Sequence, residues 1–260
     1  MIGRLLRQAK ALGSLVLYET LGPLAARGYR SREIIGWPRW VGDLLEVEIP
    51  LAVVPIACSS PECGPNINII FSLLDRTLDI PGEIVECGVF RGNSLAAMAL
   101  YLRQRAVAKR IFGLDSFQGF DESVQKDLEL GGAENSEKRV HGFDRTSFSH
   151  VYAKLKRLGL IKSVTLIQGY FPETFSTLPS VYFSFVHLDC DLYESYKRAL
   201  EYFYGRMSPG GIILLDEYND PPWPGCNMAV DEFLVDKPEK LTLIAIDLSP
   251  GSHPVMSRVG

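Results

Sequence analysis

The sequence predicts an α/β domain built on a mostly parallel β-sheet, with helices on both faces of the sheet. From about residue 80, short apolar segments alternate with longer segments in which apolar residues recur at helical spacing, an order typical of parallel sheets. The chain has 260 residues, of which 47% are hydrophobic and 22% are charged. These proportions are those of globular proteins and exclude a largely disordered chain.

The predicted elements follow one another without an internal repeat or a low-complexity linker. Strands are expected at 83–87, 110–115, 164–168, 182–189, 212–216 and 241–246, with a short last strand near Val255. Helices are expected at 94–105, 147–159, 193–207 and 228–235, and the Pro-Gly-Gly sequence at 209–211 is expected to end the third of them. The sequence therefore predicts a seven-stranded sheet within one domain.

The first 40 residues differ in charge from the rest of the chain. They contain seven basic and two acidic residues, a local charge of +5 in a chain whose total is −4. Leu5, Leu6, Ala9 and Leu12 recur at helical spacing, which predicts an amphipathic helix. We expect a basic helical arm at 1–55 and the α/β domain at 56–260. The arm is expected to pack on the domain or on a second subunit as a homodimer, or to contact a membrane surface or an acidic partner.

Charge and cysteine content bear on the class of protein. A net charge of −4 argues against a nucleic-acid-binding protein, which is usually basic. Five cysteines without metal-ligand spacing or a disulfide pattern favour a cytoplasmic location. We expect no transmembrane segment, because no stretch approaches the ~20 apolar residues of a membrane span, and no signal peptide.

Acidic residues stand at the carboxyl ends of four predicted strands, namely Glu86, Asp115, Asp189 and Asp216. In open α/β sheets, ligands bind beyond the carboxyl ends of the strands. One such acid is usually a helix cap or a turn residue. Four of them at one edge of the sheet predict a functional site.

The turn after the first strand, E-C-G-V-F-R-G-N-S, is rich in glycine. Gly88 and Gly92 allow a ligand to approach the backbone closely, and Asn93 or Ser94 is expected to cap the next helix. The turn lacks the G-x-G-x-x-G spacing of dinucleotide-binding proteins, and a purely structural turn remains an alternative. Asp115 is placed to bind both hydroxyls of a ribose. An adenosyl ligand without a pyrophosphate fits both features, and S-adenosylmethionine (SAM) is the obvious candidate.

Six motifs in order resemble the macrocin O-methyltransferase family. They are V-E-C-G-V-F-R-G-N-S (85–94), L-D-S-F-Q-G-F (114–120), Q-G-Y-F-P-E-T-F (168–175), H-L-D-C-D-L-Y-E-S (187–195), P-G-G-I-I-L-L-D-E-Y (209–218) and P-G-C-N-M-A-V-D-E-F (224–233). The resemblance covers roughly residues 80–235. It implies a Rossmann-like class I methyltransferase that uses SAM to methylate a hydroxyl of a sugar or of a glycosylated natural product.

The resemblance also implies roles for individual residues. The first loop would hold the methionine part of SAM through Glu86, Gly88, Val89, Phe90, Arg91, Gly92, Asn93 and Ser94. Asp115 would bind the ribose, with Ser116 and Phe117 near the adenosine and with Gln168 and Gly169 beside the adenine. A divalent cation, expected to be Mg²⁺, would be bound by Asp189, Asp216 and Glu217. The family is expected to have aspartate where this chain has Glu217, and the longer side chain bears on how the metal is held.

Methylation of a sugar hydroxyl needs a base and alignment of the oxygen with the methyl group. Asp191 is the candidate base and His187 the alternative, with Asp189 beside them as a catalytic metal ligand. The competing interpretations are that Asp191 caps the next helix and that His187 is simply buried in its strand. Cys87 and Cys190 are interpreted as small packing residues rather than nucleophiles.

Two further segments are assigned to the acceptor. The polar segment 118–149 is interpreted as a structureless lid over SAM and the acceptor, or as a flexible insertion. Aromatic and proline residues are candidates for an acceptor cleft or for a rigid turn, namely Tyr170, Pro221, Pro222, Trp223 and Pro224. The alternative functions are a nicotinamide-dependent oxidoreductase on the same type of sheet and a non-catalytic SAM-binding protein.

Overall fold

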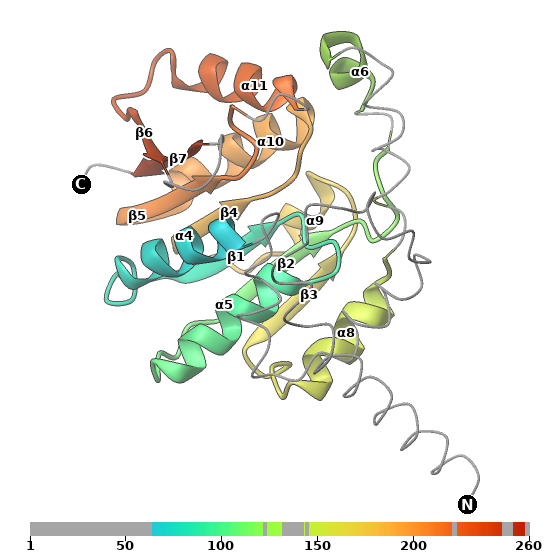
Figure 1. The fold of residues 1–260 in the computed structure, drawn as a ribbon, viewed down its shortest axis with the longest axis vertical. Helices are drawn as coiled ribbons and strands as arrows, with labels where there is room; N and C mark the ends of the chain where they lie inside the picture. The colour runs from blue at the N-terminus through green and yellow to red at the C-terminus, as the bar shows by residue number, and fades with distance from the viewer. Residues whose placement is uncertain are drawn as a thin grey trace, which may run out of the picture. The chain divides into compact units, whose positions relative to one another are not determined.

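A computed structural model describes residues 64–121, 124–131, 143, 146–219, 223–245 and 252–257 (Figure 1). The chain divides into two compact units, Met1–Asn68 and Ile69–Gly260, and the sheet and the site described below belong to the second. The predicted basic arm and the predicted boundary between residues 55 and 56 lie outside the described residues.

Seven strands form one sheet in the order β3-β2-β1-β4-β5-β7-β6 (Figure 1). The strands are β1 (Glu83–Cys87), β2 (Ile111–Asp115), β3 (Val164–Gln168), β4 (Phe183–Leu188), β5 (Met207–Leu215), β6 (Leu241–Ala245) and β7 (Ser252–Ser257). Strands β1 to β5 pair in parallel, whereas β7 runs antiparallel to both β5 and β6. The predicted α/β class and the parallel arrangement of the first five strands are confirmed. The strand order reverses beside β1, where ligands bind in such sheets.

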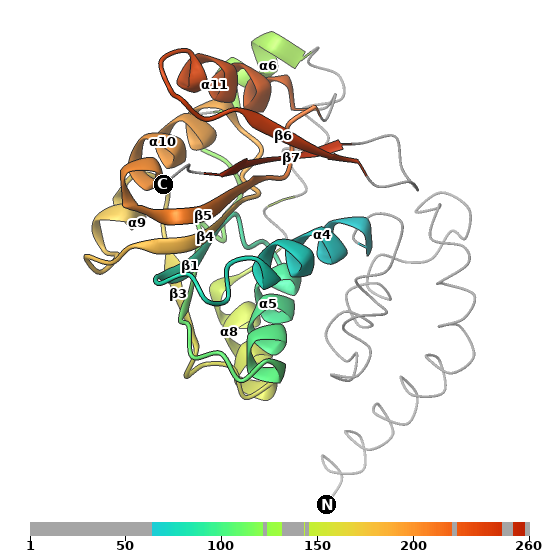
Figure 2. The same ribbon diagram turned by 90° about the vertical axis from the view of Figure 1, so that its left-hand side faces the viewer.

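Helices cover both faces of the sheet (Figure 2). The described helices are α4 (Gly64–Asp75), α5 (Asn93–Gln104), α6 (Gln125–Gly131), α8 (Phe148–Arg157), α9 (Glu173–Ser176), α10 (Tyr193–Phe203) and α11 (Pro224–Leu234), with a 3₁₀ turn η3 (Tyr204–Arg206). Helices α9, α10 and α11 pack on one face through a buried core that includes Phe175, Tyr196 and Val230. On the other face, Leu95 of α5 lies over Gly113 of β2.

The start of α5 differs from its prediction. Gly92 is the N-cap residue, in the left-handed conformation with φ +70°, and no side chain caps the helix. Asn93 instead uses its Oδ1 to accept a hydrogen bond of 2.5 Å from Lys154 Nζ. The predicted capping by Asn93 or Ser94 is therefore wrong, because glycine makes the turn and Asn93 is used in a contact with α8.

Strand β5 begins earlier than the sequence indicates. The predicted strand 212–216 extends back to Met207, and the preceding α10 ends at Phe203. The pairing of β4 with β5 changes register between Phe183 and Phe185, opposite the Pro-Gly-Gly sequence. Proline and glycine are tolerated at such an irregularity, so the three residues interrupt the pairing without ending the strand.

Candidate functional site

The carboxyl ends of β1, β4 and β5 meet at one edge of the sheet. The backbone N–H of Asp189 donates to Cys87 O at 2.9 Å, and that of Asp216 donates to Leu188 O at 2.9 Å. Glu86 lies opposite His187 in the register of β1 and β4. The strand-end acids Glu86, Asp189 and Asp216 are therefore brought to one place, as expected from a parallel sheet.

Three carboxylates converge after β4 and β5. Asp189, Asp216 and Glu217 each offer an oxygen, and these oxygens lie within 4.8 Å of one another. Burial raises the pKa of Asp189 to about 7, with a further rise from the charge of Asp216 and an opposing effect of His187. Burial also raises the pKa of Glu217 well above its ordinary value, and the charges of Asp189 and Asp191 add to this. Such crowded carboxyl groups favour either protons or a cation between them.

The donor set fits a hard divalent cation. All three candidate ligands are carboxylates, and oxygen ligands are those that Mg²⁺ and Ca²⁺ prefer. The presence of Glu217 in place of an aspartate leaves the three groups within reach of one ion. The three carboxylates are partly buried, so water would screen the charge of a bound cation less than it does at an exposed site.

Tyr196 positions Glu217, a role that the sequence did not suggest. Its buried hydroxyl contacts Glu217 Oε2 and Leu188 O, the latter at 2.7 Å. The same oxygen accepts hydrogen bonds from the backbone N–H groups of Asp216 at 3.1 Å and Glu217 at 3.3 Å. In the sequence, a tyrosine at an apolar position of α10 is indistinguishable from a core residue. Its hydroxyl makes these contacts because the loop after β5, at Asp216 and Glu217, lies against it.

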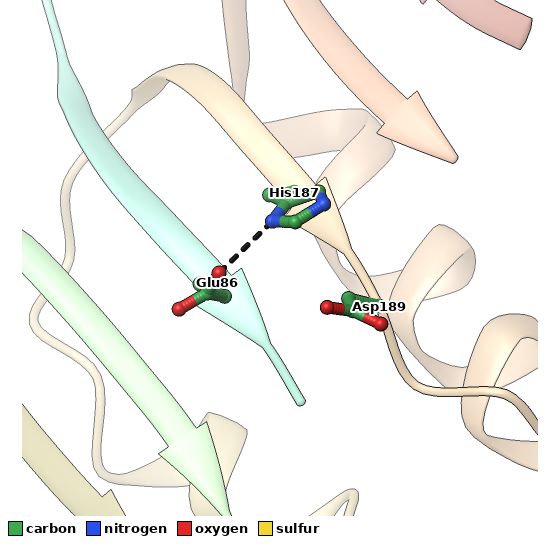
Figure 3. A group of neighbouring side chains, drawn as sticks. All are labelled: Glu86, His187 and Asp189. Carbon is green, nitrogen blue, oxygen red and sulfur yellow. Dashed lines mark hydrogen bonds and ion pairs between the residues drawn. The ribbon is translucent and has the colours of Figure 1, made fainter. Parts of the chain in front are cut away.

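His187 is buried within β4 and lies between two acidic side chains. Its Nδ1 is 3.0 Å from Glu86 Oε1 (Figure 3). Its Nε2 is 3.4 Å from Asp216 Oδ1. Burial lowers the pKa of His187, but hydrogen bonds with Asp216 and Glu86 outweigh burial and raise the pKa well above its ordinary value. The expectation that His187 is buried in its strand is confirmed, and the structure adds its two partners.

The glycine-rich loop is shaped by Asp115. Its Oδ2 accepts hydrogen bonds from the backbone N–H groups of Val89 at 2.8 Å and Phe90 at 2.7 Å, and its Oδ1 accepts one from Phe117 at 2.6 Å. Gly88 has φ +91°, and a Cβ there would lie 1.6 Å from Asp189 O. The loop therefore passes directly against the chain that carries Asp189, an approach that only glycine allows.

The remaining predicted cofactor residues surround this loop. Val89 is buried, and the carbonyl oxygen of Arg91 accepts a hydrogen bond from Lys154 Nζ at 2.7 Å. Ser116 donates its hydroxyl to Gly119 O, and Gln168 donates to Ser116 O at 3.2 Å. The ring of Phe117 is buried against Phe148. The N–H of Gly169 donates to Asp115 O at 2.9 Å, which joins the ends of β2 and β3.

Asp191 lies in the loop between β4 and α10. It is buried, has a left-handed backbone with φ +60°, and its N–H donates to Glu217 Oε2 at 3.3 Å. The N-cap residue of α10 is Leu192, so the alternative that Asp191 caps this helix is wrong. Few non-glycine residues adopt positive φ, and such strain is concentrated at functional sites.

The segment 118–149, predicted to lack secondary structure, contains a helix and supplies a carboxylate, that of Asp127, to the N-terminal end of α10. Helix α6 lies within 118–149, and its buried Asp127 accepts from Tyr193 N with both oxygens, at 3.0 and 3.2 Å. Burial raises the pKa of Asp127 to about 6. The prediction of a segment without secondary structure is wrong, because α6 docks on the N-terminal ends of α10 and α11.

Aromatic rings from three segments meet beside the loop. Phe143 lies 5.4 Å from Phe90, 5.0 Å from Phe120 and 6.1 Å from Trp223 between ring centroids. Trp223 is only 4% exposed, and its ring lies edge-on to those of Phe120 and Phe143. Tyr170 is half-buried, Pro224 is the first residue of α11, and Pro221 and Pro222 lie outside the described residues.

The thiols of Cys87 and Cys190 are free and buried, and burial raises the pKa of each. Raised thiol pKa values disfavour the reactive thiolate, which agrees with their interpretation as packing residues. Within the described part of the chain, no helix has the length and apolar character needed to cross a membrane.

Comparisons with known proteins identify relatives of this chain. The family model described as Macrocin-O-methyltransferase (TylF) matches residues 74–251. A curated relative from Streptomyces olivaceus, 8-demethyl-8-(2,3-dimethoxy-alpha-L-rhamnosyl)-tetracenomycin-C 4'-O-methyltransferase, is 37% identical over 144 residues, covering 54% of each chain. The chain spans between about half and two thirds of the length of the curated relatives it matches.

Solved structures show the same fold. The O-methyltransferase NovP superposes with a TM-score of 0.63 at 27% identity, covering 76% of this chain and 81% of NovP. An O-methyltransferase from Bacillus cereus, solved in complex with SAH, has a TM-score of 0.51 at 17% identity over 93% of this chain and 99% of its own, and at this identity it shows the fold alone. The family model covers more than half of the sequence and includes every strand-end acid described above, so the chain belongs to the macrocin O-methyltransferase (TylF) family.

Proposed function

We propose that this protein is a SAM-dependent O-methyltransferase that methylates a hydroxyl on the sugar of a glycosylated natural product, assisted by a divalent cation. The observation that carries the proposal is the family match over 74–251 together with the convergence of Asp189, Asp216 and Glu217. The relative from Streptomyces olivaceus is named for methylation of a rhamnosyl group, which supports a sugar acceptor. The same family match disfavours a nicotinamide-dependent oxidoreductase.

The proposed SAM-binding residues are those at the ends of β1, β2 and β3. Support comes from the loop geometry, since Asp115 fixes the N–H groups of Val89 and Phe90, and from Glu86. Glu86 Oε2 is buried and has no hydrogen-bond partner among the residues that the structure describes. A buried carboxylate oxygen without a partner is costly, so a donor from a ligand such as the ammonium group of SAM would satisfy it.

The proposed metal ligands are Asp189, Asp216 and Glu217. A divalent cation bound there would lower the pKa of a hydroxyl oxygen and fix its orientation. Tyr196 and the N–H of Asp191 hold Glu217 in place. Gly88 lets the proposed cofactor loop approach the backbone at Asp189 closely. The loop and the metal ligand would therefore orient the cofactor and the acceptor oxygen side by side.

We assign the role of general base to Asp191. Its position two residues beyond Asp189, its contact with Glu217 and its left-handed backbone support this assignment. His187 is less suited to that role because both of its ring nitrogens already face carboxylates. The acceptor cleft is proposed near Tyr170 and Trp223, and a lid role for 118–149 stays a prediction.

Methyl transfer from labelled SAM to a panel of glycosides tests the proposal. We expect transfer to a sugar hydroxyl, loss of transfer after treatment with a chelator, and recovery with Mg²⁺. Asp189→Ala is expected to abolish turnover while SAM still binds. Turnover after exhaustive chelation would contradict the metal role, and SAM binding without transfer to any glycoside would favour a non-catalytic SAM-binding protein.

A further inference from the structure

His187 joins two groups of side chains that the proposed function assigns to different ligands. Its side chain is 1% exposed, and the side chain of Glu86 is fully buried. Glu86 stands at the end of β1, immediately before the cofactor loop, whereas Asp216 stands at the end of β5, in the proposed metal site. The imidazole thus lies between an acid of the cofactor side and an acid of the metal side.

Each nitrogen of the imidazole faces a different carboxylate. Nδ1 is 3.0 Å from Glu86 Oε1, and Nε2 is 3.4 Å from Asp216 Oδ1. Ionised carboxylate oxygens only accept hydrogen bonds, and an imidazole with a proton on both ring nitrogens donates one hydrogen bond to each carboxylate. A hydrogen bond of this kind to a charged carboxylate restrains its orientation.

The consequence on the cofactor side is visible in Glu86. With Oε1 bonded to His187, the second oxygen is turned away from the imidazole (Figure 3). That oxygen, Oε2, is the buried atom that lacks a partner among the described residues. His187 therefore determines which oxygen of Glu86 is presented and in which direction.

The consequence on the metal side concerns Asp216 and Asp189. Asp216 contacts His187 and also belongs to the group formed with Asp189 and Glu217. Donor atoms of Glu86, His187 and Asp189 form a second group within 4.8 Å, so Asp189 adjoins both. Groups that hydrogen-bond to metal ligands orient them, and their loss typically weakens metal binding by about 10- to 100-fold.

We propose that His187 is a positioning residue that orients Glu86 for the cofactor through Nδ1 and Asp216 for the divalent cation through Nε2. The proposal rests on the proposed function, because it takes Glu86 to face SAM and Asp216 to face the metal. It assigns to one buried residue the geometry of both ligands, instead of a role in proton abstraction.

Two isosteric substitutions separate the two hydrogen bonds. The amide nitrogen of asparagine can take the place of Nδ1, and that of glutamine can take the place of Nε2. His187→Asn is expected to keep SAH affinity within about threefold and to weaken Mn²⁺ binding at least tenfold. His187→Gln is expected to do the reverse, and His187→Leu is expected to weaken both.

The full chain is titrated with SAH alone and with Mn²⁺ alone, and calorimetry measures the binding. Far-UV circular dichroism verifies that each variant is folded. Glu86→Gln is the control that should weaken SAH binding only. Asp216→Asn is the control that should weaken Mn²⁺ binding only, and the side chain of Asp216 is 18% exposed. Equal losses of both ligands in the asparagine and glutamine variants, or no loss in either, would overturn the positioning role. A wild-type chain that binds neither SAH nor Mn²⁺ would instead refute the proposed function.

Discussion

Substitution of Gly225 by alanine is expected to weaken the packing of α6 against α10 and α11. A Cβ at Gly225 would lie 1.8 Å from Asp127 Oδ1 and 2.9 Å from Tyr193 Cβ. The carboxylate would have to leave the N-terminus of α10, where it accepts from Tyr193 N. The free energy of unfolding then falls because a buried donor loses a charged acceptor and because the methyl group overpacks the contact.

The magnitude follows from these two effects and one that opposes them. A hydrogen bond to a charged group contributes about 1.5–3 kcal/mol, and overpacking costs about 1–3 kcal/mol. Alanine is favoured over glycine in a helix by about 0.8–1 kcal/mol, and less in the first turn, where Gly225 lies. The net loss expected for Gly225→Ala is roughly 2–5 kcal/mol.

Urea unfolding with linear extrapolation measures this loss. Gly205→Ala is the matched control, since a Cβ at Gly205 meets nothing within 4 Å, and we expect it to be neutral. In an Asp127→Ala background, Gly225→Ala should cost clearly less, because the carboxylate that it displaces is absent and only the contact with Tyr193 Cβ remains. Equal costs of Gly225→Ala in both backgrounds would refute the proposed contact between the two residues.

Three other predictions address the candidate site. The pKa of Asp189 is about 7 and that of Glu217 is raised, so protons compete with the cation for these carboxylates. In calorimetric titrations, the apparent Kd for Mn²⁺ should therefore rise by about tenfold for each pH unit below 7. An apparent Kd that stays constant between pH 5.5 and 7 would exclude these residues as ligands. Tyr196→Phe should weaken Mn²⁺ binding at least tenfold, because Glu217 loses a buried partner, while Tyr218→Phe, which removes an exposed contact with Asp231, should leave it unchanged. Gly88→Ala should abolish SAH binding because its Cβ meets Asp189 O, whereas Gly159→Ala incurs only the cost of positive φ and should retain it; SAH binding by Gly88→Ala would contradict the close approach of the loop.

Much of the site could be predicted because it depends on the periodicity of strands. The apolar segments of β1, β4 and β5 end at Glu86, Asp189 and Asp216, and parallel pairing alone brings such ends together. The sequence therefore sufficed to place the acids at one edge. It did not supply the partners of His187, because these depend on the register between neighbouring strands, which strand periodicity does not determine.

The contacts of Asp127 and Tyr196 were beyond sequence reasoning for a different reason. Asp127 lies in a polar segment, and its buried carboxylate occupies space that Gly225, far along the chain, leaves open. Tyr196 has the spacing of a core residue, and its hydroxyl is used only when the loop after β5 folds across α10. Both depend on tertiary packing between segments that no local pattern connects. Local patterns also misread the Pro-Gly-Gly sequence, which interrupts the pairing inside β5 instead of preceding it.

The three backbone hydrogen bonds to Asp115 have a consequence for engineering the cofactor site. A carboxylate offers about four lone pairs, and Val89, Phe90 and Phe117 already use three of them. With the loop in this geometry, about one acceptor position is left for a ribose hydroxyl, and the expectation that Asp115 binds the ribose stays a prediction. A substitution made at Asp115 to admit a modified nucleoside would also release two N–H groups of the glycine-rich loop. A redesign of the proposed nucleoside contact at Asp115 would therefore need a compensating change that keeps the shape of the glycine-rich loop.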